Sequence, residues 1–218
     1  MPSPDAGNRK EFRDHNNNAS ARFWGFGTAN ALRDFASRFR AFSRSGVELF
    51  VVRAGMAGNL AGHSLVVMLN RRGEALLLDT TTVAASNGGT LLRVETQQWS
   101  GVANQQALRA RLEAHARTFG VDAENLALVS IARRLDPAAV GKVIAAGLFW
   151  EAVSAAGLVA FQLTGPNSFD KSGFFMNCNN MTTNITSASG LSVDWDDVGM
   201  DGPRLEWGLC TRLGPARF

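Results

Sequence analysis

The chain has 218 residues, a length that fits one domain or at most two small ones. Charged residues make up 19% of the sequence, which is too few for a disordered chain. Positive charges exceed negative ones by only three, and the arginines are scattered without a basic run. A nucleic-acid-binding protein gathers its basic residues in a patch, so we do not expect nucleic acid as a partner.

Residues 1–22 are polar and predict a mobile arm in front of a single domain over residues 23–218. The arm contains no apolar stretch of the kind that secretory signal peptides need. We therefore expect synthesis in the cytoplasm, with any export following a route that reads no cleavable signal. The two cysteines, Cys178 and Cys210, are too few for a disulfide scaffold or for a thiolate zinc site.

The first half of the domain predicts a helix, a strand and a hairpin. Apolar residues recur at steps of three and four ahead of Gly46, as in an amphipathic helix: Leu32, Phe35, Phe39 and Phe42. Residues 47–52 predict a strand. Two apolar runs, 63–69 and 74–82, flank a turn and predict a β-hairpin buried on both faces.

Further along, residues 104–120 predict a surface helix that turns three apolar side chains inward: Leu108, Leu112 and Phe119. Residues 126–134 predict another strand. After Thr164 the sequence is rich in turn-forming residues and predicts loops around one short helix. Together these patterns predict one α+β domain in which helices pack on an antiparallel sheet.

The longest apolar segment covers residues 140–163, and from 143 onward its one ionisable residue is Glu151. It predicts a long buried core helix, broken or bent near Gly157 and inserted into the domain. The alternative is a membrane-inserting segment over 143–163, because about twenty apolar residues can span a bilayer. A carboxylate at the centre of the span is costly in that setting.

The sequence around Cys178 predicts the start of the short helix. Asn177 is a favourable N-cap, and Gly190 supplies a stop. One helical face then carries four residues: Cys178, Met181, Ile185 and Ala188. A cysteine at a helix N-terminus meets the positive end of the helix dipole, which favours the nucleophilic thiolate. The alternative is a small buried apolar side chain, the common state of a free cysteine.

A nucleophilic cysteine needs a base, and the sequence has three histidines. His15 lies in the polar arm, and His115 lies beside arginines on the predicted exposed face of the helix over 104–120. His63 begins a buried strand, where its imidazole would project at the end of the sheet, and it is the candidate base. The alternative is a structural histidine at the end of a strand.

The predicted hairpin offers a third residue. If residues 71–73 form a three-residue loop, His63 pairs with Thr81, and Asp79 lies diagonally across on the same face. Asp79 would then hold the imidazole in the tautomer that a triad requires. A slip of one residue turns Asp79 away and puts Thr80 opposite His63. The sequence therefore supports the pairing of His63 with Cys178 more firmly than the role of Asp79.

Two short motifs carry a family resemblance: a Gly-His that begins an apolar strand (62–69) and an Asn-Cys-Asn that begins a helix (177–185). They resemble the circularly permuted papain-like fold of the PPPDE peptidases, the lecithin:retinol acyltransferase-like proteins and the permuted NlpC-type cell-wall peptidases. The resemblance implies that Cys178 is the nucleophile and His63 the base. Asn177 and Asn179 match the flanks of the cysteine motif. The stretch between the two motifs is longer than a compact member needs.

The resemblance implies a cysteine-dependent amide hydrolase that needs neither metal nor cofactor. The predicted hairpin register adds Asp79 as the candidate third catalytic residue. The chain also resembles type VI secretion effectors, which implies peptidoglycan peptides as substrate, a target-cell periplasm as destination and an immunity protein as partner. Protein deamidation or ubiquitin-like peptidase activity fits the same dyad. The alternatives from other classes are a membrane-inserting toxin and a non-catalytic binding module.

Overall fold

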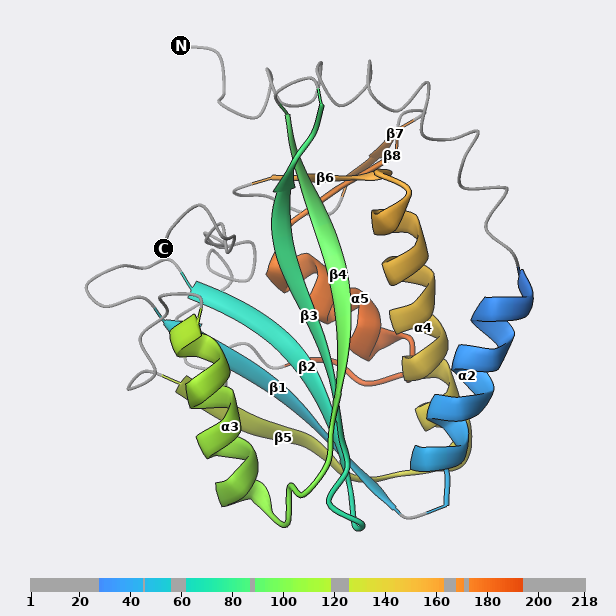
Figure 1. The fold of residues 1–218 in the computed structure, drawn as a ribbon, viewed down its shortest axis with the longest axis vertical. Helices are drawn as coiled ribbons and strands as arrows, with labels where there is room; N and C mark the ends of the chain where they lie inside the picture. Colours follow the sequence, from blue (N-terminus) through green and yellow to red (C-terminus); the bar gives the residue numbers. More distant parts are fainter. Residues whose placement is uncertain are drawn as a thin grey trace.

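A computed structural model of the protein describes residues 28–44, 46–55, 62–86, 89–118, 126–162, 168–170 and 173–193. In this part of the chain one sheet carries helices on both faces, so the predicted α+β class is confirmed (Figure 1). The predicted arm over 1–22, with His15, lies outside the described residues, and so does Cys210.

The sheet of the described residues has eight strands in the order β5-β1-β2-β3-β4-β6-β8-β7. Neighbouring strands pair antiparallel, as predicted, except β6 and β8, which are parallel. The bounds are β1 (Val47–Gly55), β2 (Gly62–Asn70), β3 (Ala75–Ala84), β4 (Thr90–Trp99), β5 (Leu126–Leu135), β6 (Val159–Phe161), β7 (Ser168–Asp170) and β8 (Gly173–Met176).

Four described helices cover the sheet: α2 (Thr28–Phe42), α3 (Gln105–Thr118), α4 (Pro137–Ala155) and α5 (Cys178–Ser187). α3 packs on one face, with Leu108 and Leu112 buried as predicted, and Phe119 lies outside the described residues. The other three helices pack on the opposite face. α2 is the predicted amphipathic helix and contacts the core through its C-terminal half, so Leu32, near its start, is 67% exposed.

The hairpin of β2 and β3 has the register that a three-residue loop predicts. Val66 pairs with Leu78, and the N–H of Asn70 donates to the carbonyl of Glu74 at 2.9 Å. Gly73 closes the turn with φ +77°, a left-handed conformation that residues with a Cβ rarely adopt. This register fixes which residues of the two strands share a face.

The two faces of β2 belong to two separate buried layers, because consecutive residues of a strand point to opposite sides. Leu65 and Val67 pack in the layer under α3, whereas Val66 and Met68 join the core under α4 and α5. The hairpin is therefore buried on both faces, as predicted.

The long apolar segment is a core helix followed by a strand. α4 ends at Ala155, and Gly157 takes φ +78°, which is the predicted break. The residues after Gly157 form β6 rather than more helix, because they pair with β4 and β8. Seven residues of α4 are buried: Val140, Val143, Ile144, Gly147, Trp150, Val153 and Ser154. Length and composition alone would let α4 cross a membrane, a test that core helices also pass.

Besides β6, three of the described strands were missed by the sequence patterns. β4 pairs with β3 along its whole length, although its sequence mixes Thr, Arg, Glu and Gln with apolar residues. β7 and β8 fall in the tail that predicted loops. Pairing with a neighbouring strand stabilises such segments even where the local pattern is weak.

Candidate active site

Two of the three predicted site residues are in direct contact. His63 lies near the start of β2 and Asp79 on β3, and the Nε2 atom of His63 is 2.5 Å from Oδ1 of Asp79. His63 is 4% exposed and Asp79 is 2% exposed. The predicted contact across the hairpin is confirmed, whereas the catalytic role of the pair stays a prediction.

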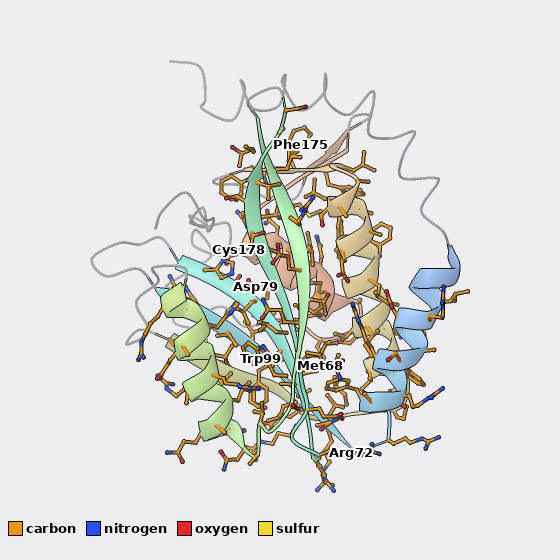
Figure 2. The ribbon with its side chains drawn as sticks, viewed as in Figure 1. Met68, Arg72, Asp79, Trp99, Phe175 and Cys178 are labelled. Carbon is orange, nitrogen blue, oxygen red and sulfur yellow. The ribbon has the colours of Figure 1, made fainter. Side chains whose placement is uncertain are left out.

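A second histidine binds the same carboxylate. The Nε2 atom of His115, on α3, lies 2.8 Å from Oδ2 of Asp79. The imidazole of His115 also meets the ring of Trp99 edge-on, with 5.8 Å between centroids. Figure 2 shows Asp79 and Trp99 on the strands beside α3. The predicted exposed position of His115 was therefore wrong.

The helical period contained the signal that places His115. It follows Leu112 by three residues and Leu108 by seven, and both leucines are fully buried. Residues at these spacings share one face of a helix. The flanking arginines suggested an exposed face, but on a helix the next residue in sequence points in a different direction.

The carboxylate of Asp79 accepts a third hydrogen bond, from the backbone N–H of Thr80 to Oδ1 at 2.7 Å. Burial works to raise the pKa of Asp79. Electrostatic attraction to His63, together with hydrogen bonds from His115 and His63, outweighs burial and holds the pKa of Asp79 well below its ordinary value. Asp79 is therefore ionised at neutral pH.

An ionised Asp79 fixes the tautomer of His63. The hydrogen bond to Asp79 requires a proton on Nε2, so in the neutral ring the lone pair lies on Nδ1. Nδ1 is buried and has no hydrogen-bond partner among the described residues. Buried polar atoms in native proteins are almost always paired, so an unpaired ring nitrogen calls for a functional explanation.

Cys178 begins α5, as predicted, and Asn177 caps the helix. The side chain of Asn177 accepts the N–H of Asn180 at 3.0 Å, and the side chain of Asn180 accepts the N–H of Asn177 at 3.1 Å. This reciprocal pair is a capping box. Of the four residues predicted to share a helical face, Cys178, Met181 and Ile185 are buried in the same core, whereas Ala188 is the partly buried C-cap.

Cys178 and His63, both in the described part of the chain, are not joined by a hydrogen bond. The hydroxyl of Ser64, the residue after His63, donates to Oδ1 of Asn179 at 2.8 Å. Neighbours on a strand point to opposite faces, so Ser64 faces α5 while His63 faces Asp79 and α3. Cys178 lies at the same end of β2 as His63, but in the core under α4 and α5. The sequence supports the pairing of His63 with Cys178 more firmly than the role of Asp79, yet the structure forms the contact with Asp79 and not the one with Cys178.

The sulfur of Cys178 is part of a disulfide bond. The other cysteine of the sequence, Cys210, lies outside the described residues. The Sγ atom of Cys178 is 3.7 Å from Oδ1 of Asn179, and the side chain is fully buried. A disulfide sulfur is not a thiolate, so the structure represents an oxidised form in which Cys178 cannot act as a nucleophile.

Within the described ranges, no group of three or more His, Cys, Asp or Glu side chains is arranged to hold a metal ion. His63 and His115 each direct Nε2 at an oxygen of Asp79 rather than at a common point. The cluster is therefore suited to hydrogen bonding and proton transfer.

The comparisons with known proteins add no relative. No family model, no curated protein and no solved structure matches the chain. The functional assignment accordingly depends on the chemistry of the site and on the resemblance of its two motifs.

Proposed function

We propose that the protein is a cysteine-dependent amide hydrolase, a peptidase or amidase, whose active form carries Cys178 as a reduced thiol. One observation carries the proposal. An ionised carboxylate holds the buried imidazole of His63 at Nε2, and Nδ1 of the same ring has no partner in the part of the chain that the structure describes. A base that is oriented at one nitrogen and open at the other is what a nucleophile–base–acid triad requires.

The position of Cys178 supports its role as the nucleophile. It is the first residue of α5, where the helix dipole and the backbone N–H groups favour a thiolate and can bind an oxyanion. The bond between Ser64 and Asn179 ties the first turn of α5 to the residue that follows the base. Nucleophile and base are therefore anchored at one end of β2.

The reaction follows from these roles. Nδ1 of His63 takes the proton of the Cys178 thiol, and the sulfur attacks the amide carbonyl carbon. The tetrahedral intermediate expels the amine, which takes the proton from His63, and a thioester remains. Water, deprotonated by His63, then attacks the thioester and releases the acid and the thiol. Asp79 stays ionised and holds the imidazole of His63 in place throughout the reaction.

The oxidised form is inactive in this scheme. A dithiol reductant would convert the disulfide of Cys178 to two thiols and itself become a disulfide. Sγ of Cys178 must then come within hydrogen-bond reach of Nδ1 of His63. That approach requires the first turn of α5 to move past Ser64, near the start of β2.

The resemblance to type VI secretion effectors extends the proposal to peptidoglycan peptides as substrate and to an immunity protein as partner. These assignments rest on analogy with that class. A purified reduced protein that cleaves the peptide stems of isolated peptidoglycan supports them. Cleavage or deamidation of cytoplasmic proteins, with peptidoglycan left intact, would contradict these two assignments but would still support a cysteine-dependent hydrolase.

A second candidate is a non-catalytic binding module. It is favoured by the burial and the disulfide of Cys178, which fit a structural half-cystine as well as a resting nucleophile. In that case His63 and Asp79 would form a structural pair. The two candidates differ in what reduction does to Cys178.

The test is the rate of alkylation by iodoacetamide at neutral pH in the reduced protein. We expect Cys178 to react much faster than Cys210, and His63→Ala to slow the reaction of Cys178 about a hundredfold, since general base catalysis contributes at least that much. Peptide mapping by mass spectrometry assigns the label to each cysteine.

Thr81→Ala is the matched control, because Thr81 lies on the same strand as Asp79 and is also buried. It should leave the rate of Cys178 unchanged. Equal alkylation rates for the two cysteines, or a Cys178 rate that His63→Ala does not change, would contradict the hydrolase proposal and favour the binding module. Leakage of liposomes that survives Cys178→Ala would instead favour the membrane-inserting alternative.

A further inference from the structure

The site contains one more imidazole than the proposed reaction uses. His115 binds Oδ2 of Asp79 at 2.8 Å, while His63 binds Oδ1 at 2.5 Å. The three groups come from three elements: α3, β2 and β3. One buried carboxylate is thus shared by two bases that compete for the same negative charge.

The charge of this cluster depends on how many of its two rings are protonated. With both rings neutral, the ionised Asp79 leaves a buried net charge of −1, which is costly in a protein interior. One protonated ring neutralises the cluster, and a second would make it cationic. On β4, Glu95 stands opposite Asp79 in the strand register, and its charge favours a protonated ring. On α3, the cation of Arg111 lies over the ring of Trp99, which is also the ring that His115 contacts edge-on.

The surroundings of the two rings decide which of them takes that proton. The side chain of His115 is 12% exposed, against 5% for His63. A cation is less costly at the more exposed ring, because more of its hydration is kept. The unpaired Nδ1 of His63 leads to the same conclusion. If the His63 ring were doubly protonated, its buried Nδ1–H would be a cationic donor without an acceptor.

We infer that His115 is a positioning residue that carries the proton balancing Asp79 and thereby keeps His63 neutral, with its lone pair on Nδ1. The inference rests on the proposed function only for the use made of that lone pair. In the hydrolase, His115 keeps the base unprotonated at neutral pH without touching the substrate. Its charge, rather than its hydrogen bond alone, performs this role.

The ¹⁵N NMR spectrum of histidine-labelled full-length protein at neutral pH tests the inference directly. Ring nitrogen shifts distinguish a doubly protonated ring from each neutral tautomer, and His63→Gln and His115→Gln assign the signals. In the wild-type protein we expect His115 to be doubly protonated and His63 to be neutral with its proton on Nε2.

Two variants separate charge from hydrogen bonding. His115→Gln keeps an N–H donor for Asp79 but removes the cation, so the proton should move to His63, whose ring becomes doubly protonated. His115→Arg keeps both donor and cation, so His63 should stay neutral. A purely structural role for His115 predicts no change at His63 in any variant that folds.

A wild-type spectrum in which His63 is doubly protonated overturns the inference without any variant. So does a His63 that stays neutral in folded His115→Gln. In the reduced protein the alkylation rate of Cys178 should fall about tenfold in His115→Gln and recover in His115→Arg, because a protonated base cannot accept the thiol proton. The NMR result should be the same in Cys178→Ala, so failure of the hydrolase and failure of this inference are distinguishable.

Discussion

The two faces of the sheet bury polar groups in different ways. Under α3, one ionised carboxylate is held by two imidazoles. On the opposite face, the buried polar groups at the start of α5 are neutral amides and hydroxyls bonded to one another and to β2: Ser64, Asn177, Asn179, Asn180 and Thr182. The charged hydrogen-bond cluster therefore lies on the α3 face, and on the α5 face Cys178 lies beside uncharged polar groups.

The comparison shows how β2 divides the site. His63 and Ser64 are consecutive, yet one joins the charged cluster and the other joins the neutral network. The candidate base and the candidate nucleophile thus lie near the start of β2 on opposite faces of the sheet. A functional site that joins His63 and Cys178 has to reach around the start of β2 from one face of the sheet to the other. The oxidation state of Cys178 and the position of the first turn of α5 therefore decide whether it can form.

The largest effect should come from removing the charge at the centre of the α3 face. In Asp79→Asn the amide offers one oxygen and a donor group, so one imidazole loses its acceptor. We expect a loss of about 3 kcal/mol in the free energy of unfolding, the size typical of breaking a buried charged pair. Urea unfolding at neutral pH measures it. Glu95→Gln on β4 is the control and should cost far less, because Glu95 is only partly buried.

Acid removes the same charge by protonating Asp79. The pKa of Asp79 is lowered by folding, so its contribution to stability is present above the unfolded value of about 4 and is lost as the pH falls toward the folded value. Wild-type stability should therefore drop below about pH 4 more steeply than that of Asp79→Asn. Parallel acid profiles for the two proteins would show that Asp79 is not the group that gives this face its charge.

The sequence predicted the Asp79 contact because a hairpin with a three-residue loop has one register, and this register put His63 and Asp79 on one face. It also predicted the cap of α5, because an Asn before a helix has a definite local role. Both are short-range features, in which the residues that matter are close in sequence or joined by one turn.

The relation of Cys178 to His63 was beyond the sequence for a physical reason. The two residues are far apart in the chain, and which face of β2 receives α5 depends on how α4 and β4 pack. Residue type alone gives no preference between the two faces of a hairpin that is apolar on both. The error on His115 was of another kind, because its spacing from Leu108 and Leu112 already indicated the inward face.

On the neutral face, the cap of α5 should have an intermediate effect. Asn177→Ala removes the acceptor for the N–H of Asn180 and should cost about 1 kcal/mol in unfolding free energy. Ser187→Ala, at the exposed end of the same helix, should change it little. The histidine NMR spectrum should be the same in both variants, because the cap lies across the sheet from His115. A change at His63 would show that the two faces are coupled through β2.

The smallest effect should come from a charged contact that holds α4 on the neutral face. Glu151 accepts from Arg38 of α2 at 3.1 Å and from Thr96 of β4 at 3.0 Å, and the side chains of Glu151 and Arg38 are 34% and 17% exposed. Water screens such a pair, so a double-mutant cycle with Glu151→Gln and Arg38→Gln should give a coupling energy of about 0.5 kcal/mol that decreases with added salt. The amide oxygen introduced by Glu151→Gln can still accept from Thr96, which isolates the loss of charge. A coupling energy several times larger would mean that α2 and α4 depend on charge as strongly as the cluster around Asp79 does. The contrast between a charged face and a neutral face would then fail.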